Sequence, residues 1–458
     1  MPSGKKLSRN GRRTVGNELN IDLKWLECQT GSPVERAFYA DIGLKAGGQW
    51  LTLLENLEAG TTSAQLSTHL RANAHLLATW FAANWWRLRW EPANPNWSKD
   101  ADWRIAHSLA SVGGGYVWPN IIFASDGDAL TLVSRPRNTP APYEPIRYLS
   151  QPDVRISAVE FECKLDAFMA GIISRLQAMN IKDDSLPELW SEIQVERGDP
   201  EATQWRKLEA LCGYDPDEAP AALLKMLIKD DAHLGSHALE EVAAQSRHAT
   251  REALRSILAL ANSTGEPRAG GFRVRMPKLQ NAPTQQTSDR PWQWAAKLAR
   301  QARREWNLGR QFITDGQLAD LLESKPDVFI DQTKAPSPMP VALRSRDSDK
   351  VDFYINQLPS TSRRFATARL LGDQLGFANG GRLFPATTAR TVRQQFQRAF
   401  AQEFLCPINA LLEKIQAEEP DENDISEAAD YFQVSQLMIR TTLVNHGYLE
   451  RETLAWAD

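Results

Sequence analysis

The chain has 458 residues with a formal net charge of −4, and 42% of its residues are hydrophobic. This length suits two or three domains with apolar cores, and the small negative charge excludes a basic field over the whole chain. No apolar run reaches the roughly 18 residues of a membrane helix and no stretch has a signal-peptide pattern, so we expect a cytoplasmic protein without membrane contact. Four cysteines without CxxC spacing fit free thiols in a reducing compartment: Cys28, Cys163, Cys212 and Cys406.

The N-terminal part of the chain predicts a basic tail followed by a mixed domain. Residues 1–17 are basic and have few apolar side chains, which predicts a disordered tail, or an arm that contacts phosphate or an acidic partner. Residues 18–150 are expected to form a tryptophan-rich α+β domain. Within it, Leu66–Trp90 has apolar side chains at three- and four-residue spacing, which predicts a helix that prolines end. Tyr116–Ser125 and Ala129–Ser134, separated by an Asp-Gly-Asp turn, predict a β-hairpin.

Tryptophans are concentrated in one part of this domain: Trp80, Trp85, Trp86, Trp90, Trp97, Trp103 and Trp118. One interpretation is an apolar core whose indole N–H groups find partners at its rim. The other is a stacking surface for bases or for a partner peptide, in which Trp85 and Trp86 lie beside Arg87 and Arg89. The sequence leaves both interpretations open.

The middle of the chain, residues 151–262, predicts a helical domain. Five helices are expected there: Ala158–Met179, Pro187–Arg197, Glu201–Cys212, Pro220–Ile228 and Leu239–Ala261. Glu240 and Glu241 are interpreted as part of a solvated helix face. Residues 263–290 are enriched in Gly, Pro, Thr, Gln and charges, which predicts a linker, with one short strand at Phe272–Met276.

Two segments near the C-terminus carry a family resemblance. Arg363–Phe377 reads RRFATARLLGDQLGF, and Gln394–Pro407 reads QQFQRAFAQEFLCP. They resemble the two motifs of the ImmA/IrrE metallopeptidases, which are of the form RRFTLAHELGHLLL and ExQANxFAAELLMP. Three further segments are similar to the family's opening helix, strand pair and closing helices: Pro291–Leu308, Val341–Gln357 and Ile425–Leu449. The resemblance covers roughly residues 290–450 and implies a zincin-like domain at 291–458. The expected fold class is α+β, mostly helical and multidomain.

The functional positions depart from the family pattern. Arg369 stands at the first zinc histidine, Leu370 at the general-base glutamate, Asp373 at the second histidine and Gln394 at the third-ligand glutamate. Zinc needs imidazole, thiolate or carboxylate donors, whereas a guanidinium has no lone pair to offer and stays protonated. We therefore expect no catalytic residue, no metal and no other cofactor in this domain, which would be a pseudo-metallopeptidase.

A site that has lost its metal can still bind a ligand. Arg363 and Arg364 are expected on or near the central helix with Arg369, and an arginine-lined site favours carboxylate or phosphate. The alternative is that Arg369 pairs with Asp373 one helical turn on and stabilises the helix surface.

The closing segment Ile425–Leu449 has the apolar rhythm of a helix-turn-helix. Its second helix offers Gln436, Arg440 and Asn445 as donors to DNA, but the acidic run Glu418–Glu427 beside it would repel phosphate. Packing within the ImmA/IrrE-like fold is the competing interpretation.

Three functions remain open. The first is a non-catalytic regulatory protein that binds a protein partner. The ImmA/IrrE group's association with phage repressors, mobile elements and stress control suggests bacterial phage defence or regulation of mobile elements. The second is a DNA-binding regulator that uses the C-terminal helices. The third is an enzyme with unrelated chemistry in residues 1–262, which would need a concave pocket with converging polar groups.

Overall fold

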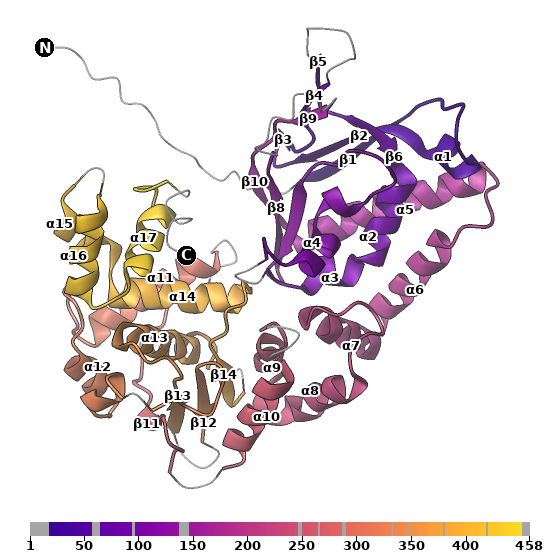
Figure 1. The fold of residues 1–458 in the computed structure, drawn as a ribbon. Coiled ribbons are helices and arrows are strands. Elements are labelled where there is room, and N and C mark those ends of the chain that lie inside the picture. Colours follow the sequence, from indigo (N-terminus) through magenta and orange to yellow (C-terminus); the bar gives the residue numbers. More distant parts are fainter. Residues whose placement is uncertain are drawn as a thin grey trace, which may run out of the picture. The chain divides into compact units, whose positions relative to one another are not determined.

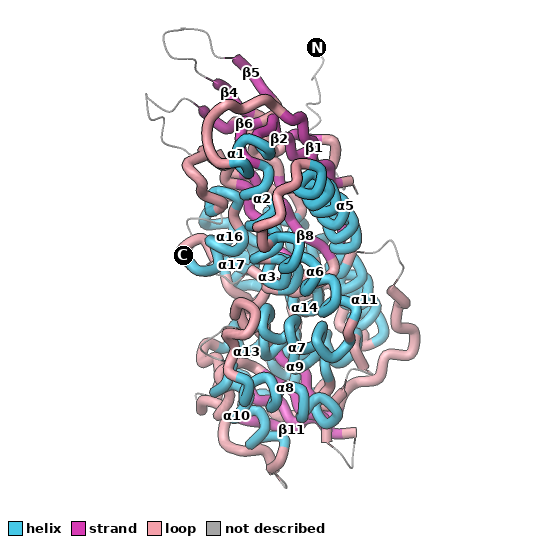
Figure 2. The backbone as a smooth tube through the Cα atoms, turned by 90° about the vertical axis from the view of Figure 1, so that its right-hand side faces the viewer, coloured by secondary structure: helices cyan, strands magenta, loops and turns pink. Residues whose placement is uncertain are grey.

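The computed structural model describes residues 18–56, 65–93, 97–136, 146–245, 250–263, 266–285, 290–331, 333–345, 349–378, 381–417 and 420–450. It has an α+β fold in which helices predominate (Figures 1 and 2). Contacts divide the chain into two compact units, Met1–Ala219 and Pro220–Asp458. Among the described residues, no helix is long and apolar enough to cross a membrane. The expected tail, residues 1–17, lies outside the described ranges.

This division differs from the expected domain boundaries. The helices expected at 151–262 are shared between the two units, because the chain passes from one unit to the other at Ala219. The expected linker at 263–290 contributes a strand, β11 (Gly271–Arg275), to the second unit. Its Phe272 and Val274 side chains are buried in the core of that unit. Because the residues around this short strand are polar, the sequence did not indicate that it pairs within the sheet of the second unit.

Three antiparallel sheets form the β part of the first unit. Their strand orders are β1-β2-β3 with β6 on β2, then β10-β8-β7, and β5-β4-β9. The strands are β1 (Leu19–Trp25), β2 (Tyr39–Ala46), β3 (Gln49–Trp50), β4 (Leu54–Asn56), β5 (Gln65–Ser67), β6 (Leu70–Asn73), β7 (Ile121–Ser125), β8 (Ala129–Ser134), β9 (Ile146–Tyr148) and β10 (Asp153–Ser157). The expected hairpin is confirmed as β7 and β8, with Ile121 opposite Ser134. Strand β7 begins after Pro119, which has no amide hydrogen to donate.

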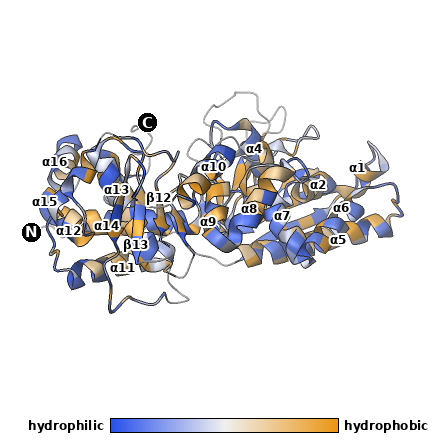
Figure 3. Ribbon diagram, turned by 90° about the horizontal axis from the view of Figure 1, so that it is seen from below, coloured by the Kyte–Doolittle hydropathy of each residue, from blue (hydrophilic) through white to orange (hydrophobic). Residues whose placement is uncertain are grey.

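Helices cover these sheets. They are α1 (Pro33–Phe38), α2 (Ala74–Ala83), α3 (Trp85–Trp90), α4 (Ala101–His107), α5 (Ala158–Ala178), α6 (Leu186–Gly198) and α7 (Pro200–Leu211), with the short 3-10 helix η1 (Leu109–Ser111). Along α5, hydrophobic and hydrophilic residues alternate (Figure 3), and Phe161, Leu165 and Ile172 are buried at helical spacing.

The single helix expected at Leu66–Trp90 is wrong in its first part. Leu70 and Ala72 are buried on alternate positions and belong to β6, which pairs with β2. The helix starts at Ala74 because the Asn73 side chain caps it, accepting hydrogen bonds from the amides of His75 and Leu76. Tertiary pairing, of β5 with β4 and of β6 with β2, therefore overrides the helical spacing of the first eight residues.

The second unit contains one antiparallel sheet of order β11-β13-β12-β14. The other strands are β12 (Val341–Arg344), β13 (Lys350–Tyr354) and β14 (Leu383–Pro385). Its helices are α8 (Ala221–Leu234), α9 (Ser236–Ala243), α10 (Thr250–Ala261), α11 (Pro291–Glu305), α12 (Asp315–Leu321), α13 (Ser360–Gly376), α14 (Val392–Leu405), α15 (Ile408–Ile415), α16 (Glu422–Phe432) and α17 (Gln436–Asn445), with the 3-10 helix η2 (Pro326–Phe329). The helices and strand pair expected from the two motif segments and from Val341–Gln357 are present.

Helices α11, α13 and α14 pack closely beside the sheet (Figure 1). A Cβ on Gly372 of α13 would lie 2.4 Å from the Phe400 ring of α14, so the contact requires glycine. Trp294 of α11 packs on Phe396, with ring centroids 4.5 Å apart. This apolar packing fixes the polar faces of α13 and α14 against β14 and α9.

Candidate functional site

Five residues form what we call the buried polar cluster: Glu241, Arg369, Asp373, Arg393 and Gln394. Arg369 and Asp373 lie one turn apart on α13, and Arg393 and Gln394 lie in the first turn of α14. Helix α14 begins there because the Thr391 hydroxyl accepts a hydrogen bond from the Gln394 amide at 3.2 Å. The structure thus brings together the three positions that the resemblance assigns to zinc ligands, Arg369, Asp373 and Gln394.

Arg369 is buried and bonded within the chain. Its Nη2 donates to Gln394 Oε1 at 2.5 Å and to the Thr387 carbonyl at 2.7 Å. Gln394 Oε1 also accepts from the Thr387 amide at 2.9 Å, while its Nε2 donates to the Pro385 carbonyl. Burial, followed by the charge of Arg398, lowers the pKa of Arg369 to about 9, so the side chain stays cationic at neutral pH.

Asp373 is fully buried and pairs with Arg393. Its two carboxylate oxygens accept from Arg393 Nε and Nη2, both at 2.8 Å. Burial lowers the pKa of Arg393, but the charge and hydrogen bonds of Asp373 together with the charge of Glu241 outweigh burial and raise that pKa overall. The expected pairing of Asp373 with Arg369 on the surface is therefore wrong, because Arg393 binds both carboxylate oxygens, while Arg369 donates to Gln394 and to the Thr387 carbonyl.

Glu241 enters the cluster from α9. Both of its carboxylate oxygens lie 2.8 Å from the Thr391 hydroxyl, which can donate to one of them at a time. Burial raises the pKa of Glu241, and the charge of Arg393 opposes this shift. The expectation of a solvated face is wrong for Glu241, which is 6% exposed. Helical spacing alone could not separate it from Glu240.

The cluster does not fit a zinc ion. Arg369 has no lone pair, and both oxygens of Asp373 are taken by Arg393. In the described part of the chain, no group of three His, Cys, Asp or Glu side chains is placed to hold a metal. Leu370, at the general-base position, is buried in the apolar core. The arrangement can hold an anion or stabilise the fold, and the position that the resemblance assigns to the general base carries no carboxylate.

Three buried polar atoms of the site have no hydrogen-bond partner in the structure: Arg369 Nε, Thr387 Oγ1 and Gln397 Oε1. A third arginine, Arg398, donates to the carbonyls of Thr388 and Ala389. Three guanidinium groups therefore share this region with the two carboxylates of Asp373 and Glu241. The local charge is positive, with donor capacity left over on Arg369.

The other two arginines of the first motif do not belong to the cluster. Arg363 is 1% exposed and donates to the carbonyls of Val328, Ile355 and Gln357. Arg364 is equally buried and bonds to Asp315 and to the Ile313 carbonyl. The expected ligand-binding role of both is corrected, because their charges are used to hold α13 to neighbouring backbone.

The predicted stacking surface of the first unit is also corrected. Trp85 and Trp86 are 2% and 3% exposed, and Trp86 Nε1 donates to Glu196 at 3.0 Å. Arg89 donates to Glu162 and to the Gly127 carbonyl. The two tryptophans are core residues, with their charged neighbours turned inward, but the expected partner of the indole N–H is found for Trp86 and not, among the described residues, for Trp85.

Arg87 organises a second buried group that sequence reasoning missed. Its guanidinium contacts Glu91 at 2.6 Å, Asp102 at 3.1 Å and Asp215 at 3.2 Å. Glu91 also lies 3.0 Å from Nε2 of His107, a fully buried ring. The spacing of Arg87 and Glu91 by four residues was the one available signal. This group joins α3, α4 and the segment after α7, and we assign it a structural role.

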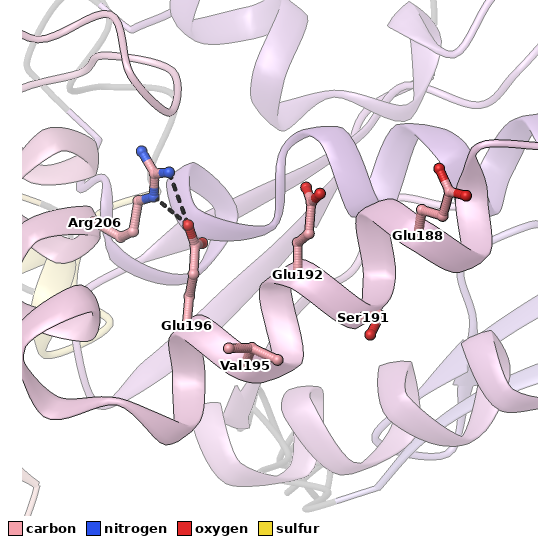
Figure 4. A pocket seen from close by; sticks show the side chains of 6 residues that line it. All are labelled: Glu188, Ser191, Glu192, Val195, Glu196 and Arg206. Carbon is pink, nitrogen blue, oxygen red and sulfur yellow. Dashed lines mark hydrogen bonds and ion pairs between the residues drawn. The ribbon is translucent and has the colours of Figure 1, made fainter.

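An open depression lies on the first unit between α6 and α7 (Figure 4). It has a volume of about 550 Å³ and is lined by Glu188, Ser191, Glu192, Val195, Glu196 and Arg206. Arg206 and Glu196 point toward each other and pair at 2.7 Å. The lining contains no histidine or cysteine beside its serine, so it offers no nucleophile with an adjacent imidazole base.

We compared the chain with protein-family models, curated proteins and solved structures. The chain matches no protein-family model, no curated protein and no solved structure.

Proposed function

We propose that this protein is a non-catalytic regulatory protein in which residues 291–458, within the second unit, form a pseudo-metallopeptidase domain of zincin-like fold that binds a protein partner. The resemblance to the ImmA/IrrE group supports the domain assignment. It also motivates the setting that we propose, bacterial phage defence or regulation of mobile elements.

The observation that carries the proposal is the state of the three ligand positions. Arg369, Asp373 and Gln394 lie together, and each is already bonded to a group of the chain itself. A permanent cation at the first position repels a metal ion, and the carboxylate at the second position is neutralised. In this proposal, the domain keeps the helices and sheet of a metallopeptidase, but its altered ligand positions cannot activate a water molecule.

The charges around the C-terminal helices favour a protein partner over DNA. Arg440 of α17 pairs with Glu422 of α16, and the Gln436 side chain donates to Ser426. Asp421 and Asp424 cap the start of α16. Two of the three donors expected to reach DNA are therefore engaged within the helix pair, next to acidic side chains that repel phosphate.

Metal analysis and a hydrolysis assay test the loss of catalysis. We expect the purified chain, incubated with zinc and desalted, to retain no stoichiometric zinc and to leave labelled casein intact. Zinc bound one to one, together with casein hydrolysis that disappears in Asp373→Ala, would overturn the proposal. Glu413→Ala, at an exposed carboxylate outside the cluster, is the matched control for that variant.

A further inference from the structure

We propose that α9 and the turn before it are a displaceable plug over the edge strand β14, and that the vacated site binds an acidic segment of a protein partner. This inference rests on the proposed function, because it names the partner class for the same site. We call β14 together with Arg369, Arg393 and Arg398 the β14 site.

The backbone contacts place residues 234–245 along the edge of the sheet. Strand β14 pairs with β12 on one side only. Just before β14, the Arg382 amide donates to the Leu234 carbonyl at 3.2 Å. Just after it, the Thr388 amide donates to Gln245 Oε1 at 3.0 Å. An unpaired strand edge is a template for an added peptide. Within β14 itself Pro385 has no amide hydrogen, and its carbonyl accepts from Gln394 and Gln397. The backbone donors available at this edge are therefore the two amides beside the strand, which the chain's own segment takes.

This close approach depends on one glycine. Gly381 has a φ of +102°, and a Cβ there would lie 2.5 Å from the Leu234 carbonyl oxygen and 2.8 Å from Gly235 Cα. Those atoms are backbone, so they cannot move aside by rotating a side chain. A side chain at position 381 therefore pushes the turn between α8 and α9 away from β14 without altering an arginine of the site.

The charge of the site indicates what replaces the plug. With Glu241 withdrawn, Arg369, Arg393 and Arg398 remain with one carboxylate, that of Asp373. Glu241 itself is held by the Thr391 hydroxyl, with the Gln394 side chain and the charge of Arg393 also acting on it. Among the described residues, Arg369 Nε and Thr387 Oγ1 lack partners. An extended peptide offers backbone carbonyls for the Arg382 and Thr388 amides on either side of β14 and a Glu or Asp carboxylate for these unused donors.

Fluorescence anisotropy on the full-length chain tests this. The probes are a fluorescein-labelled heptapeptide containing three glutamates and its counterpart with glutamines. We expect the glutamate peptide to bind the wild type weakly, and to bind Glu241→Ala and Gly381→Ala on the order of tenfold more tightly. The reason is that only molecules with the plug open can bind, so the apparent affinity is the intrinsic affinity multiplied by the fraction of open molecules. Glu240→Ala, on the same helix, is the control and should match the wild type.

The outcomes separate the two proposals. Loss of the gain when Arg398→Gln is added to Glu241→Ala supports the site, and so does faster hydrogen exchange of the Arg382 and Thr388 amides in Glu241→Ala. If Gly381→Ala does not fold, the binding of the two peptides to Glu241→Ala alone tests the plug. Equal affinity for both peptides in every variant overturns the plug, while the metal analysis still decides the proposed function. Binding followed by cleavage of the peptide would keep the β14 site and overturn the non-catalytic assignment.

Discussion

Asp373 and Arg393 join α13 to α14 through two parallel hydrogen bonds of 2.8 Å, and the two side chains are 0% and 7% exposed. A forked pair of this kind is among the stronger contacts between side chains. Since neither group is solvated, each depends on the other for its charge compensation. The residue at the second zinc-ligand position has thus become part of the interface between the two helices.

Breaking this pair should destabilise the second unit strongly. We expect Arg393→Met to lower the free energy of unfolding by about 3–5 kcal/mol, because it leaves a buried carboxylate without a partner. Arg310→Met removes an exposed pair with Glu413 and should cost about 0–1 kcal/mol. Urea unfolding measures both. Adding Asp373→Leu to Arg393→Met should restore much of the loss, and an equal loss in the double variant would contradict the account.

Glu241 predicts a pH dependence of stability. Burial raises its folded-state pKa above the ordinary 4.5, so its protonated form stabilises the fold below that pH, and this contribution is lost as pH rises through the raised value. Glu241→Gln keeps the shape without the titration. Its free energy of unfolding should therefore increase relative to the wild type as pH rises above about 4.5.

The measurement is urea unfolding of both proteins over a pH series, with Glu240→Gln as the control on the same helix. The control should follow the wild type at every pH. A constant difference between Glu241→Gln and the wild type over the whole series would show that folding does not favour the protonated carboxyl group.

Arg87 predicts that the first unit needs its buried charges for folding. Arg87→Met leaves Glu91, which is 8% exposed, without its guanidinium partner. We expect a loss of about 3–5 kcal/mol in the free energy of unfolding. Tryptophan fluorescence monitors the unfolding. Arg71→Met, at an exposed pair with Asp41, should cost about 0–1 kcal/mol. Equal effects of the two substitutions would argue against a structural role for the buried group.

Local pattern was enough to predict α5, α6, α7 and the hairpin, but the single helix expected at Leu239–Ala261 is wrong, because the structure has two helices there, α9 and α10. The expected Ala158–Met179 differs from α5 by one residue, because a strong apolar stripe and the Ser157 cap define that helix within the chain itself. The segment Leu66–Asn73 could not be assigned correctly, since its spacing also fits a helix and pairing with β4 and β2 decides the outcome. Burial of Glu241 depends on Thr391, 150 residues away, and no local signal carries such a contact.

Restoring the ligands tests whether the buried polar cluster has the geometry of a zinc site. We expect a variant with Arg369→His, Asp373→His and Gln394→Glu, together with Arg393→Leu, to bind one zinc ion per chain. The first three changes supply two imidazoles and a carboxylate, as in catalytic zinc sites. The fourth avoids an unpaired buried cation. Elemental analysis after desalting measures the metal.

The matched control carries Arg363→His in place of Arg369→His, with the other three changes kept. Arg363 lies on the same helix but points at backbone carbonyls away from the cluster, so this variant should retain little zinc. Metal in the first variant alone would support the zincin-like arrangement of α13 and α14, because coordination requires donors within about 2.0–2.2 Å of one point. A folded first variant that binds no more zinc than the control would show that the three positions, although close together, do not converge as a metallopeptidase site does.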